Sequence, residues 1–259
     1  MQEKYAPTTP LATETHEDFS EPILPGKGAS DYERYLRTDD LLSLQKTPEE
    51  QTHPDELLFQ TVHQSSELWL KLATSEIDRA ARHVRAGEVP AALRLLRRST
   101  ICLQFITGQL DMLEQMSPWE YQSIRRVLGH GSGFDSPGWR EVRRVTPPLG
   151  AAFEEALAAA GLDTVEVYVQ GREHEELYQL AEALVEWDER VTMWRIRHYK
   201  VVARIIGDQV VGTQGTPVEV LGKMIHHNFF PALWRARNQL TARAKEEEAT
   251  ESEVPGHGL

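Results

Sequence analysis

The chain of 259 residues is 40% hydrophobic and 26% charged, an ordinary composition for a globular protein that can bury a sizeable core. Its net charge of −12 argues against a nucleic-acid partner, because a phosphate-binding surface needs clustered Lys and Arg. No apolar run approaches the roughly 18 residues that a membrane span requires, so we expect a soluble protein without a membrane partner.

The N-terminal sequence MQEKYAPTTPLATETHEDFSEP is acidic and rich in Pro and Thr, and it lacks the apolar core of a signal peptide. Residues 1–30 have little to bury and are expected to form a flexible tail. The one cysteine, Cys102, cannot form an internal disulfide, and its apolar surroundings ICLQF favour an inert core thiol in a reducing compartment. We therefore expect the protein in the cytoplasm.

Apolar residues recur at helical spacing through most of the remaining chain, and they predict helices near 31–46, 54–86, 89–115, 118–128, 147–160, 173–206 and 217–243. Ser117 and Thr216 are the expected N-caps before Pro118 and Pro217, and Gly207 is the expected end of the longest helix. Only TVEVYVQG (164–171) alternates like a strand, and one strand makes no sheet. The prediction is an all-α bundle over residues 31–243, followed by an acidic C-terminal tail over 244–259.

Two histidines lie on apolar faces of the two longest predicted helices. His63 follows Phe59 by four residues and His198 follows Trp194 by four, so each imidazole shares a helix face with an aromatic ring. Taken singly, each is a core histidine that hydrogen-bonds to a neighbour. Together they favour a cofactor held between facing helices, because imidazole is a common protein ligand of haem iron.

Tyr121 and Arg125 also share a helix face, directly before the loop GHGSGFDS. Such an arginine can bind a substrate carboxylate through two hydrogen bonds, although a solvated surface arginine is the alternative. The glycines of the loop are not followed by Lys-Ser/Thr, which argues against a phosphate loop. The segment VVGTQGTP (210–217) is either a plain linker or a flap whose Thr213 or Thr216 hydroxyl contacts a ligand.

These residues together resemble the tryptophan 2,3-dioxygenase family of haem enzymes. The stretch HPDELLFQTVHQSSELWLKL (53–72) is similar to the family block His-x-Asp-Glu-x-Leu-Phe-x-x-x-His-Gln-x-x-Glu-Leu-Trp. DYERYLRTDDLLSLQ (31–45) resembles its Tyr-x-x-Tyr-Leu segment, and SPWEYQSIRRVLGHGSGFDSPGWR (117–140) its Tyr-x-x-x-Arg helix and Ser-Gly-Phe-Gln-Ser loop. WRIRHYKVVARIIG (194–207) and GTQG (212–215) resemble the helix that bears the haem ligand and the Gly-Thr-Gly-Gly loop.

The resemblance implies an all-α bundle that holds haem b between long helices and uses O₂ as co-substrate. It implies that His198 is the axial ligand of the haem iron and that His63 is the distal histidine, near bound oxygen and the indole N–H. Phe59 would line the indole pocket, and Ser132 would lie at the haem edge.

The resemblance also implies a site for the amino-acid end of the substrate. Arg125 would pair with the carboxylate, with Tyr121 beside it, and Thr213 or a neighbour would meet the ammonium or the carboxylate. The family forms tetramers with intertwined N-terminal segments, so a homo-oligomer (a tetramer or a dimer of dimers) is expected. In it, a neighbouring subunit's pocket would be completed by Tyr32, Tyr35 and Leu36.

The chain departs from the family pattern in its loops. Asp135 stands where Ser-Gly-Phe-Gln-Ser has Gln, and Gly-Thr-Gly-Gly-Ser has become Gly-Thr-Gln-Gly-Thr-Pro. The spacing from His198 to Thr213 is one residue longer than usual, and the middle of the chain, near 145–185, is shorter and poorly matched. The departures fall on substrate-facing loops and the periphery, whereas both histidines are kept.

The first functional hypothesis is a haem-dependent dioxygenase that inserts O₂ across the indole C2–C3 bond of L-tryptophan or a close derivative, giving an N-formylkynurenine-type product. The alternative is a haem-dependent monooxygenase of a substituted indole or tryptophan that gives an oxindole in natural-product biosynthesis. Two other classes are a haem-binding sensor or carrier without turnover, which has no need of Arg125, and a helical interaction module without a cofactor.

Overall fold

The computed structural model describes residues 21–253, with side chains described for 21–250, and the chain divides into two compact units, Met1–Glu49 and Glu50–Leu259. Within the described residues every regular element is a helix, and the only β-type pairing is one isolated bridge. The predicted all-α class is therefore confirmed. No helix in this part of the chain has both the length and the apolar character needed to cross a membrane.

The first unit contains two short helices, α1 (Asp31–Leu36) and α2 (Thr38–Leu42), instead of the single helix predicted over 31–46. Ser30 and Glu33 form a reciprocal capping box at the start of α1. Arg37 has a φ of +53°, in the left-handed region, and this residue separates the two helices. Neither helix has a buried residue, and their large apolar side chains, Tyr32, Tyr35, Leu36, Leu41 and Leu42, are exposed.

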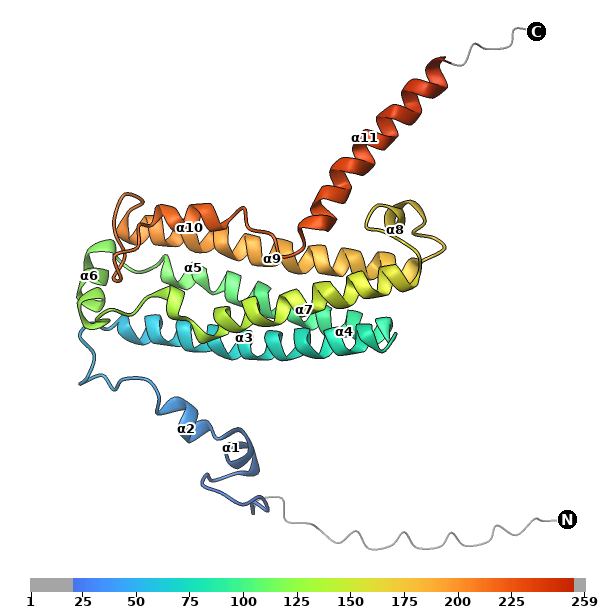
Figure 1. Cartoon of the computed structure of the whole chain (residues 1–259). Helices are drawn as coiled ribbons and strands as arrows, with labels where there is room; N and C mark the ends of the chain where they lie inside the picture. Colours follow the sequence, from blue (N-terminus) through green and yellow to red (C-terminus); the bar gives the residue numbers. More distant parts are fainter. Residues whose placement is uncertain (1–20, 254–259) are drawn as a thin grey trace, which may run out of the picture. The chain divides into compact units, whose positions relative to one another are not determined.

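The second unit is a bundle in which α3 (Glu56–Arg85), α4 (Val89–Gly108), α7 (Pro137–Ala159) and α9 (Glu175–Ile206) run side by side (Figure 1). Helix α3 packs against α4 and α7, and α4 packs against α9. The shorter elements are α5 (Leu110–Leu113), α6 (Pro118–Val127), α8 (Glu166–Val169) and α10 (Glu219–Met224), and α11 (Pro231–Glu253) ends the described chain. The fully buried core includes Leu70, Ile77, Leu103, Leu149, Leu184 and Trp187.

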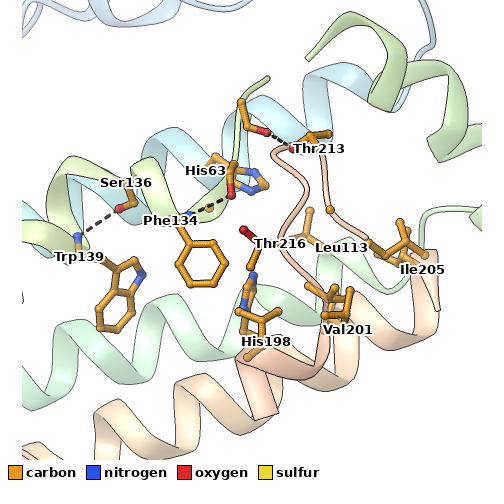
Figure 2. A pocket seen from close by; sticks show the side chains of 18 of the residues that line it. His63, Leu113, Phe134, Ser136, Trp139, His198, Val201, Ile205, Thr213 and Thr216 are labelled. Atoms are coloured by element: carbon orange, nitrogen blue, oxygen red, sulfur yellow. Dashed lines mark hydrogen bonds between the residues drawn. The ribbon is translucent and has the colours of Figure 1, made fainter. Parts of the chain in front are cut away.

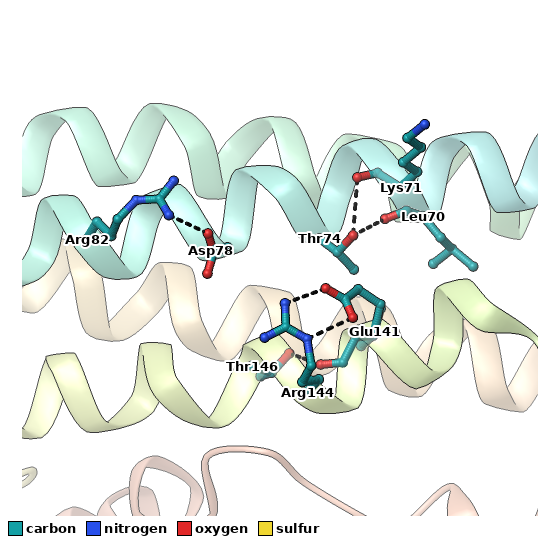
Figure 3. Close-up of polar contacts among 9 residues, drawn as sticks. Leu70, Lys71, Thr74, Asp78, Arg82, Glu141, Arg144 and Thr146 are labelled. Carbon is teal, nitrogen blue, oxygen red and sulfur yellow. Dashed lines mark hydrogen bonds and ion pairs between the residues drawn. The ribbon is translucent and has the colours of Figure 1, made fainter.

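The contact between α3 and α7 contains two buried threonines whose hydroxyls remain paired (Figure 3). The Thr74 hydroxyl donates to the Leu70 carbonyl and the Thr146 hydroxyl donates to the Val142 carbonyl, each at 2.8 Å. Neither therefore carries the free-energy cost of a buried, unpaired polar group. At the exposed rim, ion pairs join Arg82 to Asp78 and Arg144 to Glu141.

Helix α7 begins at Pro137, whereas the sequence predicted a start near 147. The Ser136 hydroxyl caps it by accepting the Trp139 N–H at 3.1 Å. Pro147 and Pro148 lie inside the helix on its exposed side, where each interior proline costs about 3 kcal/mol. The prediction was wrong because this cost is offset by a continuous buried face: Val142, Val145, Leu149, Phe153 and Leu157.

The segment TVEVYVQG forms helix α8 and no strand. The Asp163 carboxylate accepts the N–H groups of Val165 and Glu166 at 2.7 and 2.8 Å, so it caps a helical turn. Val167 is fully buried in the core. The Asp163 cap, directly before this segment, thus outweighs the strand-like alternation of its valines.

The helix predicted over 217–243 is divided into α10 and α11, because a buried carboxylate holds the segment between them. Asp188, on α9 and fully buried, accepts the backbone N–H groups of Phe229 and Phe230 at 2.9 and 3.1 Å. It also accepts the indole N–H of Trp234 at 2.9 Å. Helix α11 then begins at Pro231, where the missing N–H costs nothing.

Gly207 ends α9 as predicted, with a φ of +99°, and the following segment turns back on itself. Val211 and Pro217 form the isolated antiparallel bridge, so Thr216 is not the N-cap expected from the sequence. The N-cap position of α10 is Val218. Residues 210–218 therefore form a closed turn rather than a helix start.

Candidate active site

The second unit encloses a cavity of about 420 Å³, lined mainly by apolar side chains of α3, α6, α9 and α10 and by the loops 131–136 and 212–218. This volume is within the range of small-molecule and cofactor sites. Figure 2 shows His63, on α3, and His198, on α9, facing this space from different walls. Phe59, Tyr121, Arg125, Ser132 and Thr213 line the same cavity. Seven of the site residues predicted from the sequence thus come together.

His63 has a defined tautomer in this cavity. Its Nδ1 lies 2.7 Å from the Phe59 carbonyl oxygen, which can only accept, so Nδ1 carries the proton. The two rings are in contact, with centroids 4.1 Å apart. The ring faces the cavity, and its desolvation by the surrounding side chains lowers the pKa of His63, although the bond to Phe59 and the charge of Glu67 raise it in part. At neutral pH the Nε2 atom is therefore an unprotonated hydrogen-bond acceptor.

His198 is a neutral imidazole whose nitrogen lone pair is not used in any hydrogen bond among the described residues. Burial, with a smaller effect from the neighbouring His63, lowers the pKa of His198 to about 4. The Trp194 indole stacks on its ring, with centroids 4.7 Å apart and planes inclined by 7°. Within residues 21–250 no hydrogen bond is made by either nitrogen of His198. A lone pair on this ring is thus available to a ligand in the cavity.

The stack on His198 continues to α7, which is hydrogen-bonded to the helix that carries His63. Trp139, at the start of α7, contacts Trp194 with centroids 4.1 Å apart. Glu67, one turn after His63 on α3, accepts the Ser136 hydroxyl at 2.5 Å and the Gly138 N–H at 2.8 Å. A carboxylate near a helix N-terminus is a favourable arrangement. Glu67 therefore fixes the start of α7, and with it the position of the stacked tryptophans.

The close approach of α3 and α7 depends on a glycine. A Cβ atom at Gly138 would lie 2.6 Å from the Leu70 Cβ and 2.7 Å from a carboxylate oxygen of Glu67. No other residue fits without a shift of one helix. The glycine thus permits the hydrogen bond between its own N–H and Glu67.

Tyr121 and Arg125 form the α6 side of the cavity. The Tyr121 ring lies 6.0 Å from that of Phe59, and burial raises the pKa of its phenol, while the charge of Arg125 lowers it in part. The Arg125 Nη2 donates to the Val211 carbonyl at 2.6 Å. This bond uses one of the five N–H donors of the guanidinium and leaves the others for a ligand.

The two loops that close the cavity hold Ser132 and Thr213. The Ser132 hydroxyl accepts the Phe134 N–H at 3.3 Å, within a capping box formed with Asp135. The Thr213 hydroxyl donates to the Gly131 carbonyl. Because its proton is used in that bond, the Thr213 oxygen offers lone pairs to the cavity.

The remaining predicted residues lie in the first unit. Tyr32, Tyr35 and Leu36 are on α1, and their exposed fractions are 69%, 78% and 46%. Such exposure of large apolar side chains is what a subunit contact would require, and α1 has no buried residue.

The sequence analysis missed several lining residues that the structure places beside the two histidines. Glu67 was detectable, since it lies four residues after His63 on the same helix face, whereas the spacing of Trp194 from His198 had already placed that ring beside the histidine. Trp139, Phe134 and Leu113 had no such pattern, because tertiary packing alone brings them to the cavity.

Comparison with known proteins shows the family of this chain. Residues 15–152 match the family model described as tryptophan 2,3-dioxygenase. A tryptophan 2,3-dioxygenase of Bacillus anthracis is 31% identical over 276 aligned positions, which cover 87% of this chain and 95% of the relative. The chain belongs to the tryptophan 2,3-dioxygenase family. It is an oxidoreductase, and the resemblance read from the sequence motifs is confirmed.

Other members of the family have similar coverage. The tryptophan 2,3-dioxygenases of Myxococcus xanthus DK1622 and Pseudomonas fluorescens Pf-5 are 31% and 33% identical, over 83% and 81% of this chain and 91% of each relative. The family model includes His63 and Arg125, whereas His198 and Thr213 lie beyond its matched residues. The alignment with the Bacillus relative is longer than this chain of 259 residues, so it contains gaps in this chain.

Proposed function

We propose that the protein is a haem-dependent dioxygenase that adds both atoms of O₂ across the indole C2–C3 bond of L-tryptophan or a close derivative, with an N-formylkynurenine-type product. The observation that carries the proposal is the pair of neutral histidines, His63 and His198, that face one mainly apolar cavity. Relatives named tryptophan 2,3-dioxygenase, aligned over most of the chain, support the substrate and the reaction.

The residues of the cavity fit haem b. A histidine that binds haem iron must be neutral and have an unused nitrogen lone pair, and His198 would hold the iron in this way. The Trp194 Nε1–H, buried beside it, has no hydrogen-bond partner among the described side chains, so it is left to donate to a polar group of the cofactor. The apolar walls suit a flat, largely hydrophobic ring system.

Bound ferrous haem would supply the activation of dioxygen, and the protein supplies orientation and a water-poor site. His63 presents its Nε2 lone pair, which suits the indole N–H, a group that can only donate. Phe59 packs beside that imidazole and forms an apolar wall for the indole. Together they orient C2 and C3 of the indole within the cavity.

The amino-acid end of the substrate would be bound by the loops and by α6. Arg125 has free N–H donors for the carboxylate, with the Tyr121 phenol beside it. Thr213 donates its proton to Gly131, so its oxygen suits the ammonium rather than the carboxylate. We assign Ser132 to the edge of the haem, since it lies on the loop that lines the cavity.

The active assembly is proposed to be a homo-oligomer, a tetramer or a dimer of dimers, that works in the cytoplasm. The exposed Tyr32, Tyr35 and Leu36 would then complete the pocket of a neighbouring subunit. The lone, buried Cys102 suits a reducing compartment, and burial raises the pKa of its thiol, so it stays protonated.

The number of oxygen atoms in the product tests the reaction. Haem-loaded protein, ascorbate and L-tryptophan are incubated under ¹⁸O₂, and the product is analysed by mass spectrometry. We expect two labelled atoms and a ring-opened product. One labelled atom and an oxindole would identify the monooxygenase alternative, which no named relative supports.

A variant tests the cofactor site. His198→Ala is expected to purify without stoichiometric haem and to remain colourless after hemin is added, while its helical circular dichroism is retained. A normal haem content and absorption spectrum in this variant would refute the axial assignment. Arg126→Ala, an exposed site on α6, is the matched control that keeps haem.

A further inference from the structure

The segment from Gly207 to Val218 is a turn with few hydrogen bonds between its own residues. The Gly212 N–H donates to the Thr216 carbonyl at 2.8 Å, and the Val218 N–H donates to the Val210 carbonyl at 3.1 Å. Gly215, at the tip, has a φ of +78°, which a side chain would disfavour. A turn this short depends on contacts with other segments for its position.

Three hydrogen bonds join this turn to residues 125–135. Arg125 donates to the Val211 carbonyl at 2.6 Å, and Thr213 donates to the Gly131 carbonyl. The third bond runs from the Gln214 Nε2 to the Asp135 Oδ2, at 2.5 Å. The first two use groups that the proposed function assigns to the substrate, whereas the third uses two residues without any assigned role.

The third bond joins two positions at which the chain departs from the family motifs described above. Glutamine replaces a glycine at position 214, and aspartate replaces a glutamine at position 135. A glycine has no side chain with which to make the contact. The two departures therefore create one interaction, a primary amide that donates to an ionised carboxylate, which is stronger than a bond between neutral groups.

We propose that Gln214 and Asp135 are a positioning pair that holds the turn 210–218 against the loop 131–135, and thereby sets the site for the amino-acid end of the substrate. Gln214 lies at the wall of the cavity, and its amide is used in the bond to Asp135, so the pair acts by holding the two loops together. The pair acts through the backbone, because Gln214 directly follows Thr213 and Asp135 also accepts the Ser132 N–H at 3.2 Å. The inference rests on the proposed function for its effect on the substrate but not for its effect on the turn.

The pair matters because the residues that make the other two bonds, Arg125 and Thr213, are also proposed to bind the substrate. Arg125 must divide its donors between the Val211 carbonyl and a substrate carboxylate. If the turn were held by Arg125 and Thr213 alone, substrate binding would compete with the contacts that position it. The bond between Gln214 and Asp135 uses no group that the proposed function assigns to the substrate, so it persists when substrate binds.

Hydrogen exchange of the full-length protein as purified tests the pair without reference to activity. In Gln214→Ala and Asp135→Ala, we expect amide exchange of peptides spanning 207–221 to rise about two- to tenfold, the effect of losing one net hydrogen bond. Asp135→Asn keeps an acceptor oxygen and should stay close to the parent protein. Gln209→Ala, at an exposed glutamine in the same segment, is the matched control.

A double-mutant cycle separates the pair from the cap that Asp135 gives Ser132. The variant with both alanines should exchange no faster in 207–221 than Asp135→Ala alone, because the pair is already lost. Additive effects, or unchanged exchange in Gln214→Ala, would overturn the proposal while the proposed function stands.

Substrate binding gives the second readout. Gln214→Ala should weaken L-tryptophan binding to the haem-loaded protein about two- to tenfold and leave 3-methylindole, which lacks the amino-acid end, within twofold. Equal weakening of both ligands would overturn the assignment of the pair to the amino-acid end. If the parent protein binds neither ligand, the proposed function fails, and the exchange result still decides the pair.

Discussion

The indole of Trp194 lies flat on the imidazole of His198, with ring centroids 4.7 Å apart and planes inclined by only 7°. An imidazole without a hydrogen-bond partner can rotate about its side-chain bonds, so this stack fixes the plane of the ring. The stack therefore prepares the nitrogen lone pair for a ligand in the cavity before the ligand arrives.

Removing the stacked ring should weaken haem binding. Trp194→Ala is expected to reduce hemin affinity by about 0.5–1.5 kcal/mol or more, the contribution of an aromatic pair beyond its buried area. Trp194→Phe should retain much of the affinity. Hemin titrations monitored by absorbance measure the effect, with Trp119→Ala, an 84% exposed tryptophan on α6, as the control. Equal affinities for Trp194→Ala and the control would contradict this role.

Loss of the Arg125 guanidinium should weaken binding of amino-acid substrates. Arg125→Leu removes a charge-assisted hydrogen bond to the carboxylate, so we expect L-tryptophan affinity to fall by about 1.5–3 kcal/mol. The change also breaks the bond to the Val211 carbonyl. Calorimetric titration with tryptamine, which lacks the carboxylate, separates the two effects, since its affinity should change much less. An unaltered L-tryptophan affinity would refute the proposed contact between Arg125 and the substrate carboxylate.

The state of His63 predicts the pH dependence of substrate binding. Its pKa is lowered below the ordinary value of 6.5, chiefly by burial, so the Nε2 acceptor persists as the pH falls through 6.5 and is lost only below it. L-Tryptophan affinity should therefore decline as the pH falls, with a midpoint below pH 6.5. In His63→Ala the affinity should be weaker and independent of pH over the same range. A midpoint above pH 6.5 in the parent protein would disprove the assignment.

Gly138 predicts a stability effect that composition alone would not suggest. Gly138→Ala places a Cβ within 2.6 Å of the Leu70 Cβ, and such overpacking should lower the free energy of unfolding by about 1–3 kcal/mol. Gly108→Ala, on α4 and without neighbours within 4 Å, is the matched control and should be neutral or slightly stabilising. Urea denaturation of both variants measures the difference. Similar unfolding midpoints would show that α3 and α7 can separate at no cost.

The long helices and the inward histidines were predictable because their cause is local. Four-residue spacing puts Phe59 beside His63 and Trp194 beside His198, whatever the rest of the chain does. The end of α9 was equally local, since Gly207 takes up a positive φ there. Periodicity and caps thus predicted the walls of the cavity, and the contact between Phe59 and His63 is as expected.

The failures have tertiary causes. Helix α7 continues through two prolines because its buried face offsets their cost, and the last predicted helix is divided because Asp188, more than 40 residues upstream, binds the intervening N–H groups. The bond between Gln214 and Asp135 joins residues that are 79 positions apart, and no sequence pattern within either loop predicts it. Such contacts depend on packing that a single sequence does not reveal.

The carboxylate of Glu67 bears on any attempt to alter the substrate range of this protein. It joins the helix of His63 to the start of the helix of Trp139, and Trp139 stacks on the Trp194 ring beside His198. Randomising Ser136 or Gly138 would therefore disturb the surroundings of both histidines at once. The tips of the two loops, at 131–135 and 212–216, carry no such coupling to Glu67. A combinatorial library directed at Gly133, Phe134 and Thr216 of those tips, with Asp135, Gln214 and residues 136–139 left intact, would vary the cavity while the contacts that position its loops are kept.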